Sequence, residues 1–90
     1  MDMMLKSRKN LTRFTYETTA FEGWRLCVSR SGTTFTKYFS DKGYGSPRDS
    51  LRAAERTRTK LLRVIDNSRR VNGKLSQATV EKAWKILEAA

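Results

Sequence analysis

Residues 24–40 read WRLCVSRSGTTFTKYFS, and this stretch decides the fold. In its first seven residues, apolar side chains alternate with mostly polar ones, which is typical of a strand with one buried face. Ser31 and Gly32 then predict a turn, because glycine tolerates a positive φ. Residues 33–40 are rich in β-branched and aromatic side chains and predict a returning strand. The stretch therefore predicts an antiparallel hairpin.

Alternation along the two strands divides their side chains between two faces. The face expected to meet the core carries Trp24, Leu26, Val28, Phe35, Lys37 and Phe39. The opposite, outward face carries Arg25, Cys27, Ser29, Thr34, Thr36 and Tyr38. Two placements stay open for Lys37: its ammonium group reaches solvent at the sheet edge, or a bulge turns it to the other face.

A third strand is expected over residues 11–16, which have the composition of a strand. A lone hairpin is marginally stable in water, so this partner is physically needed. Alternation predicts that Phe14 and Tyr16 share one side, whereas Arg13 and Thr15 lie on the other and join the outward set.

A long helix is expected over residues 47–66. Ser46 offers a capping hydroxyl, Pro47 suits the first helical position, and no further glycine or proline follows. Its apolar stripe comprises Leu51, Ala54, Leu61, Leu62 and Ile65, and its opposite face carries Arg52, Arg56, Lys60 and Arg63. That basic face suits solvent exposure or phosphate binding.

A shorter helix is expected over residues 76–90, after a polar connector that turns near Gly73. Ser76 is its expected N-cap. Its apolar stripe comprises Val80, Ala83, Trp84 and Leu87. This stripe packs on its own domain, or it contacts a second copy or a protein partner.

The expected fold class is α+β: a three-stranded antiparallel sheet packed on one long helix, with an additional short C-terminal helix. Residues 1–10 are expected to form a basic, flexible tail and residues 11–66 the sheet-and-helix domain. Residues 67–75 form the connector, and residues 76–90 form the C-terminal amphipathic helix.

The composition narrows the classes of function. The 90 residues contain 19 Lys and Arg against nine Asp and Glu, which gives a net charge of +10 and favours polyanionic partners. The chain has no histidine and one cysteine, so a zinc finger, a Cys–His nucleophile pair and a disulfide framework are excluded. No enzyme activity, cofactor, metal or membrane partner is expected, and the expected location is cytoplasmic and nucleoid-associated.

A family resemblance covers about residues 23–62. The residues that carry it are 23–32, the run Phe35-Thr36-Lys37-Tyr38-Phe39-Ser40-Asp41, Tyr44-Gly45, and Leu51-Arg52-Ala53-Ala54 with Arg58 and Leu61. Together they resemble the phage and bacterial branch of the ethylene-response-factor (Apetala-two type) DNA-binding domain, which is appended to integrases and homing endonucleases. The resemblance implies a three-stranded sheet on one helix, with the exposed sheet face in the major groove.

The expected function is therefore that of a small double-stranded DNA-binding protein, a transcriptional regulator or a mobile-element accessory factor. Its expected DNA-contacting residues are Arg13, Thr15, Arg25, Cys27, Ser29, Arg30, Thr34, Thr36 and Tyr38. Lys6, Arg8 and Lys9 of the tail are expected to contact phosphates. For Tyr38, cross-strand packing is an equal alternative to DNA contact. An RNA-binding domain and a protein-interaction module acting through the C-terminal helix are the alternative functions.

Overall fold

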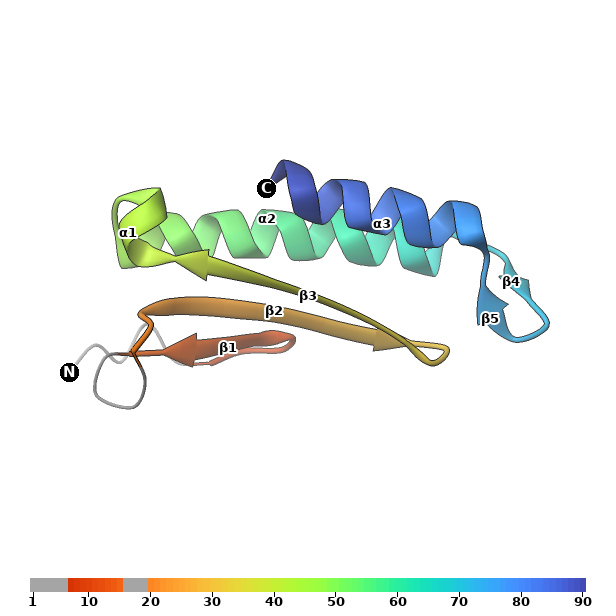
Figure 1. Cartoon of the computed structure of the whole chain (residues 1–90), viewed down its shortest axis with the longest axis horizontal. Coiled ribbons are helices and arrows are strands. Elements are labelled where there is room, and N and C mark those ends of the chain that lie inside the picture. Colours follow the sequence, from red (N-terminus) through yellow and green to blue (C-terminus); the bar gives the residue numbers. More distant parts are fainter. Residues whose placement is uncertain (1–6, 16–19) are drawn as a thin grey trace.

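The computed structural model describes residues 7–15 and 20–90, in which strands precede most of the helical structure. Strands β1 (Leu11–Phe14), β2 (Gly23–Arg30) and β3 (Thr33–Ser40) form an antiparallel sheet in the order β1-β2-β3. A short helix α1 (Asp41–Tyr44), the long α2 (Pro47–Asp66), a hairpin of β4 (Arg70–Val71) and β5 (Lys74–Leu75), and α3 (Gln77–Ala89) follow. Figure 1 shows α2 and α3 side by side along one side of the sheet. The predicted α+β class, with its sheet, long helix and C-terminal helix, is confirmed.

The β2–β3 hairpin supplies the centre of the core, as its alternation predicts. Trp24 pairs with Phe39 and Val28 with Phe35, and all four side chains are fully buried. Burial of large apolar side chains is the main favourable contribution to folding. These side chains therefore hold the sheet against α2.

Strand β1 faces the opposite way from the prediction. Leu11 is buried in the core, and Arg13 follows it on the same side of the strand. Phe14 instead lies on the outward face, where its ring centroid is 6.4 Å from that of Tyr38. Side chains alternate along a strand, so the position of Leu11 determines the others. Thr15 follows the end of β1, and Tyr16 lies outside the described residues.

Helix α2 begins as the sequence predicts. The Ser46 hydroxyl accepts a hydrogen bond from the backbone N–H of Asp49, and Pro47 occupies the first helical turn. The buried face includes Leu51, Ala53, Ala54, Thr57, Leu61 and Ile65. Thr57 satisfies its buried hydroxyl by donating to the carbonyl of Ala53 at 2.8 Å. The predicted basic face is exposed: Arg52, Arg56, Lys60 and Arg63.

Two connecting segments are more ordered than the sequence predicts. Residues after β3 form α1, capped by the Ser40 hydroxyl, which accepts from the N–H of Gly43. The connector at 67–75 contains the β4–β5 hairpin. Asn72 and Gly73 have φ values of 52° and 77°, and two successive positive φ angles are those of a tight hairpin turn.

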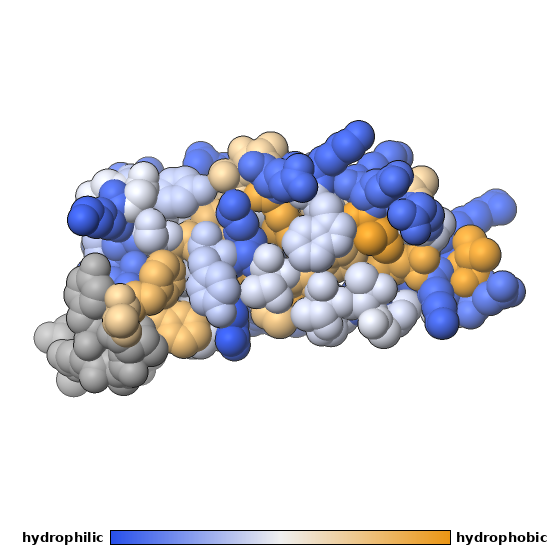
Figure 2. Space-filling view, in the orientation of Figure 1, coloured by the Kyte–Doolittle hydropathy of each residue, from blue (hydrophilic) through white to orange (hydrophobic). Residues whose placement is uncertain are grey.

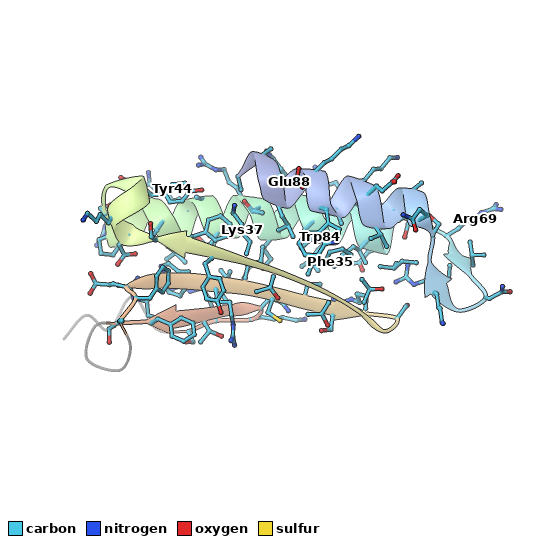
Figure 3. The ribbon with its side chains drawn as sticks, in the orientation of Figure 1. Phe35, Lys37, Tyr44, Arg69, Trp84 and Glu88 are labelled. Carbon is cyan, nitrogen blue, oxygen red and sulfur yellow. The ribbon has the colours of Figure 1, made fainter. Side chains whose placement is uncertain are left out.

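Helix α3 packs on its own domain through the positions nearest α2. Ala83 and Leu87 are buried, and Val80 packs against the core. Trp84 is 40% exposed and stands at the border, with its ring centroid 5.4 Å from that of Phe35. Figure 3 shows Trp84 on the side of α3 that faces Phe35 of β3. The buried side of α3 is thus centred on Ala83, and Trp84 lies at its edge.

Candidate nucleic-acid interface

The outward face of the sheet lies opposite the helices. Within residues 7–15 and 20–90, α2 and α3 pack only on the Trp24 side of the sheet (Figure 1). The side chains that alternate onto the outward face are Thr12, Phe14, Arg25, Cys27, Ser29, Thr34, Thr36 and Tyr38. None of these carries a carboxylate. The face is therefore open, weakly polar and without negative charge among the described residues.

Aromatic rings occupy the end of this face nearest β1. The Phe21 ring meets the Tyr38 ring edge-on, with centroids 5.6 Å apart, and the Phe14 ring at 6.3 Å. The guanidinium of Arg25 lies 5.5 Å from the centre of the Phe14 ring. Tyr38 packs in this cluster and is also 53% exposed, so its packing is observed and its DNA contact stays a prediction.

Arg25 combines a fixed position with unused hydrogen-bonding capacity. Its Nε atom is buried without a partner and is closed to a ligand, whereas its two Nη atoms are not buried and donate to no described residue. The N–H groups of the two Nη atoms suit the paired acceptors of a guanine edge or a phosphate. Stacking on Phe14 limits the freedom that Arg25 would lose when it binds.

Hydroxyl groups occupy the other end, towards the β2–β3 turn. The Ser29 and Thr34 hydroxyls are hydrogen-bonded at 2.9 Å, and the Thr36 hydroxyl donates to the Cys27 Sγ at 3.9 Å. A hydroxyl both donates and accepts, so these groups keep further capacity for base edges or phosphates. The structure thus brings together six of the predicted residues: Arg25, Cys27, Ser29, Thr34, Thr36 and Tyr38.

Arg13 does not belong to this face, which corrects the prediction. Its side chain is 10% exposed and its two terminal nitrogens donate to the Asp41 carboxylate at 2.9 and 2.7 Å. Burial by itself raises the pKa of Asp41. Hydrogen bonds from Arg13 and Ser50 and the positive charge of Arg13 outweigh it, so the pKa lies below 3.8. Arg13 also stacks over the buried Trp24 ring at 5.3 Å. It links β1 to α1 and is a structural residue.

Arg30 also lies away from the outward face, and its expected DNA contact stays a prediction. It shares the core-side alternation of Val28, and its Nε atom lies 3.9 Å from an Asp66 carboxylate oxygen at the end of α2. Its Nη1 atom donates to the carbonyl of Ser29. The side chain is therefore at the strand end, on the helix side of the sheet.

The described part of the predicted tail is folded. Arg8 and Leu11 exchange two backbone hydrogen bonds of 2.9 and 2.8 Å, and the Asn10 carbonyl accepts from the Cys27 N–H. Arg8 pairs with Glu55 of α2 at 3.1 Å, and the Lys9 carbonyl accepts from the guanidinium of Arg58. Arg8 and Lys9 thus belong to a turn bound to α2, and Lys6 lies outside the described residues.

Positive charge gathers away from the outward face. The exposed cations of α2 lie on the far side of the molecule from the sheet. In Figure 2, strongly hydrophilic side chains gather over the helices and the β4–β5 end, and paler, weakly polar side chains cover the strands. Lys37 keeps the core-side alternation of Phe35 and points towards the helices from the edge strand β3 (Figure 3). Its ammonium group therefore reaches solvent at the sheet edge.

The sequence reasoning missed Thr12 and Phe14 on the outward face. Leu11 was the available signal, because placing it in the core sends Thr12 and Phe14 outward. Phe21 also joins the face, although it lies in a loop where alternation makes no prediction.

Other kinds of site are not found in the described residues. No group of three or more potential metal ligands occurs in residues 7–15 and 20–90, and no helix there is long and apolar enough to cross a bilayer. Comparison with protein-family models, with curated proteins and with solved structures finds no match to this chain. Its function must therefore be argued from the geometry of the site.

Proposed function

We propose that this chain binds double-stranded DNA and places the outward face of its sheet in the major groove. The observation that carries the proposal is the unpartnered, stacked guanidinium of Arg25 on an open face of hydroxyl groups. Arginine forks and hydroxyls are the side-chain groups that read base edges. The role that the family resemblance implies is that of a regulator or a mobile-element accessory factor.

The dimensions of the sheet support this docking. Neighbouring strands lie about 4.8 Å apart, so three strands span about 10 Å. The major groove is about 12 Å wide, which admits such a ribbon. In this orientation the outward side chains of the central strand β2, which are Arg25, Cys27 and Ser29, lie along the middle of the groove.

The net charge of +10 supports binding to a polyanion, but it does not indicate which surface of the protein binds it. A protein with this charge attracts duplexes of any sequence, and the discrimination between sequences then comes from base contacts. The proposal therefore assigns discrimination to the outward face and general affinity to the net positive charge of the chain.

The experiment is a fluorescence anisotropy titration with duplex DNA, duplex RNA and single strands of the same sequence. The expected result is tightest binding to duplex DNA, with affinity falling as salt rises. A clear preference for either form of RNA would refute the proposal. Absence of binding to every polyanion would favour the alternative of a protein-interaction module that uses the exposed Trp84 of α3.

The aromatic cluster favours a second candidate, binding of single-stranded nucleic acid. Tyr38 is 53% exposed beside Phe14 and Phe21, and single-stranded bases stack on exposed aromatic rings. Tyr38→Ala separates the two candidates. It would weaken single-strand binding by about 1–3 kcal/mol per stacked base if the rings are a stacking platform. If the face enters a groove, the variant would lose no more affinity for single strands than for duplex.

A further inference from the structure

The connection between α2 and α3 contains the β4–β5 hairpin and is longer than a simple helix–helix turn. Helix–helix connections commonly take about 2–8 residues. Here the chain builds an ordered protrusion with the tight turn Asn72–Gly73 at its tip. Only Leu75 of its four strand residues is buried. The hairpin therefore adds little to the core, and its outer side needs another explanation.

Arg70 fixes this hairpin against the end of the sheet. Its Nε atom donates to the Ser31 hydroxyl in the β2–β3 turn at 3.0 Å. Its Nη1 atom donates to the Ile65 carbonyl and the Ser68 hydroxyl, both at 3.1 Å. Figure 1 shows the hairpin beside the β2–β3 turn, reaching from the helix layer towards the sheet. Its position relative to the outward face is thus set before any ligand binds.

The side of the hairpin that points away from the body is basic with an apolar spot. Val71 and Lys74 are register partners, so they share the side opposite Arg70 and Leu75. Val71 is 56% exposed. Arg69 precedes the hairpin and extends outward from this end of the molecule (Figure 3). No described carboxylate pairs with Arg69 or Lys74, and residues 67–75 contain no Asp or Glu.

We infer that the β4–β5 hairpin is a second DNA-contact element, which holds the sugar–phosphate backbone beyond the groove entered by the sheet. This inference rests on the proposed function. Phosphates wall the major groove, so a protein 46 Å long that inserts its sheet meets backbone beyond the strands. Arg69 and Lys74 neutralise phosphates there, and Val71 packs against the apolar sugar surface between them.

The test compares two double variants that remove the same charge. Arg69→Gln/Lys74→Gln removes one arginine and one lysine from the hairpin end. The matched control, Arg56→Gln/Lys60→Gln, removes one of each from the exposed far face of α2. Both are measured by anisotropy over a salt series on a duplex enriched from a random pool, after a thermal melt verifies folding.

The hairpin variant is expected to reduce the magnitude of the log Kd versus log salt slope by about 1.8, since each lost phosphate contact removes about 0.9. Hydroxyl-radical footprinting should show protection lost at one flank of the site and kept at its centre. The control variant should keep both flanks.

Equal slopes and equal footprints for the two variants would overturn the inference while leaving the proposed function intact. If the wild-type chain binds no duplex, the proposed function and the inference are both refuted. If the hairpin variant loses protection at the centre as well as the flank, the hairpin does not act as a separate contact and the inference is also wrong.

Discussion

Replacing Arg25 with alanine tests the proposed interface at the residue on which it most depends. The guanidinium stacks 5.5 Å from the centre of the Phe14 ring, and its Nε atom is buried without a partner. Binding therefore breaks no described hydrogen bond of this side chain, and the new contacts count in full. A bidentate base contact contributes about 1–3 kcal/mol of discrimination. At about 1.4 kcal/mol for each factor of ten, Arg25→Ala should weaken binding to the preferred duplex by roughly 5- to 150-fold.

The assay is paired anisotropy titration on a selected duplex and on a scrambled duplex of the same composition. Arg25→Ala should lose most affinity on the selected duplex and much less on the scrambled one, because a lost base contact lowers specificity. Arg56→Ala, on the exposed face of α2, is the matched control and should cost little on either. The melting temperature of Arg25→Ala should fall by only a few degrees, since stacking on Phe14 contributes about 0.5–1 kcal/mol. If Arg56→Ala is the variant that loses discrimination, α2 reads the DNA and the proposed docking is refuted.

Three further predictions concern stability and access. Asp41→Asn should lower the free energy of unfolding by roughly 3–5 kcal/mol in urea denaturation, because it leaves the buried Arg13 charge unpaired. The pKa of Asp41 in the folded chain is lowered, so its ionised carboxylate stabilises the fold at neutral pH, and this stabilisation is lost as the pH falls through the folded pKa. The variant should therefore have a different midpoint of acid unfolding, and an unchanged midpoint would contradict this. Cys27, the chain's one cysteine, should react with N-ethylmaleimide more slowly when saturating duplex covers the sheet, and an equal rate in mass spectrometry would place the DNA elsewhere. Trp84→Ala should cost about 1–3 kcal/mol, less than a fully buried tryptophan, because the ring is 40% exposed against Phe35; a change in sedimentation without a change in stability would instead identify a dimer contact.

Strong local patterns made much of the fold predictable. Alternation of apolar and mostly polar residues along the two strands between Trp24 and Phe39 predicted the central hairpin and its buried face. Ser46, Pro47 and Ser76 marked the starts of the two long helices, because a hydroxyl that accepts a backbone N–H satisfies a group that the helix itself leaves unpaired. Each of these signals acts within a few residues, so it can be recognised in the sequence without knowledge of the tertiary structure.

The predictions were wrong where the position of a residue depends on a partner far away in the sequence. β1 has only four residues, and its facing follows from the burial of Leu11 and from the ion pair that draws Arg13 to Asp41, 28 residues further along the chain. The exposure of Trp84 depends on how α3 meets β3, which helical periodicity does not specify. Asn72–Gly73 was a readable hairpin signal, but its flanking strands have two residues each and no alternation. Six of the nine residues expected to contact DNA through the sheet share one face, and the alternation of the β2–β3 hairpin alone identified all six.

Positive charge lies on two surfaces of the molecule, so DNA could dock on the sheet or on α2. The Arg25 variant distinguishes these two orientations. Docking through the sheet engages Arg25 with the hairpin cations Arg69 and Lys74, whereas docking through α2 engages the exposed row that includes Arg56. The two phosphate contacts of the hairpin predict a salt slope near −1.8 and the four of the α2 row predict one near −3.6, and both docking orientations attract a duplex of any sequence. Electrostatic attraction alone therefore does not choose between them. Discrimination between sequences does, because guanidinium groups spaced along an exposed helix face meet phosphates of any duplex, whereas a single guanidinium held over Phe14 among hydroxyls meets base edges. Sequence preference that disappears with Arg25 and persists without Arg56 would assign recognition to the sheet, and no measurement of affinity alone would do so.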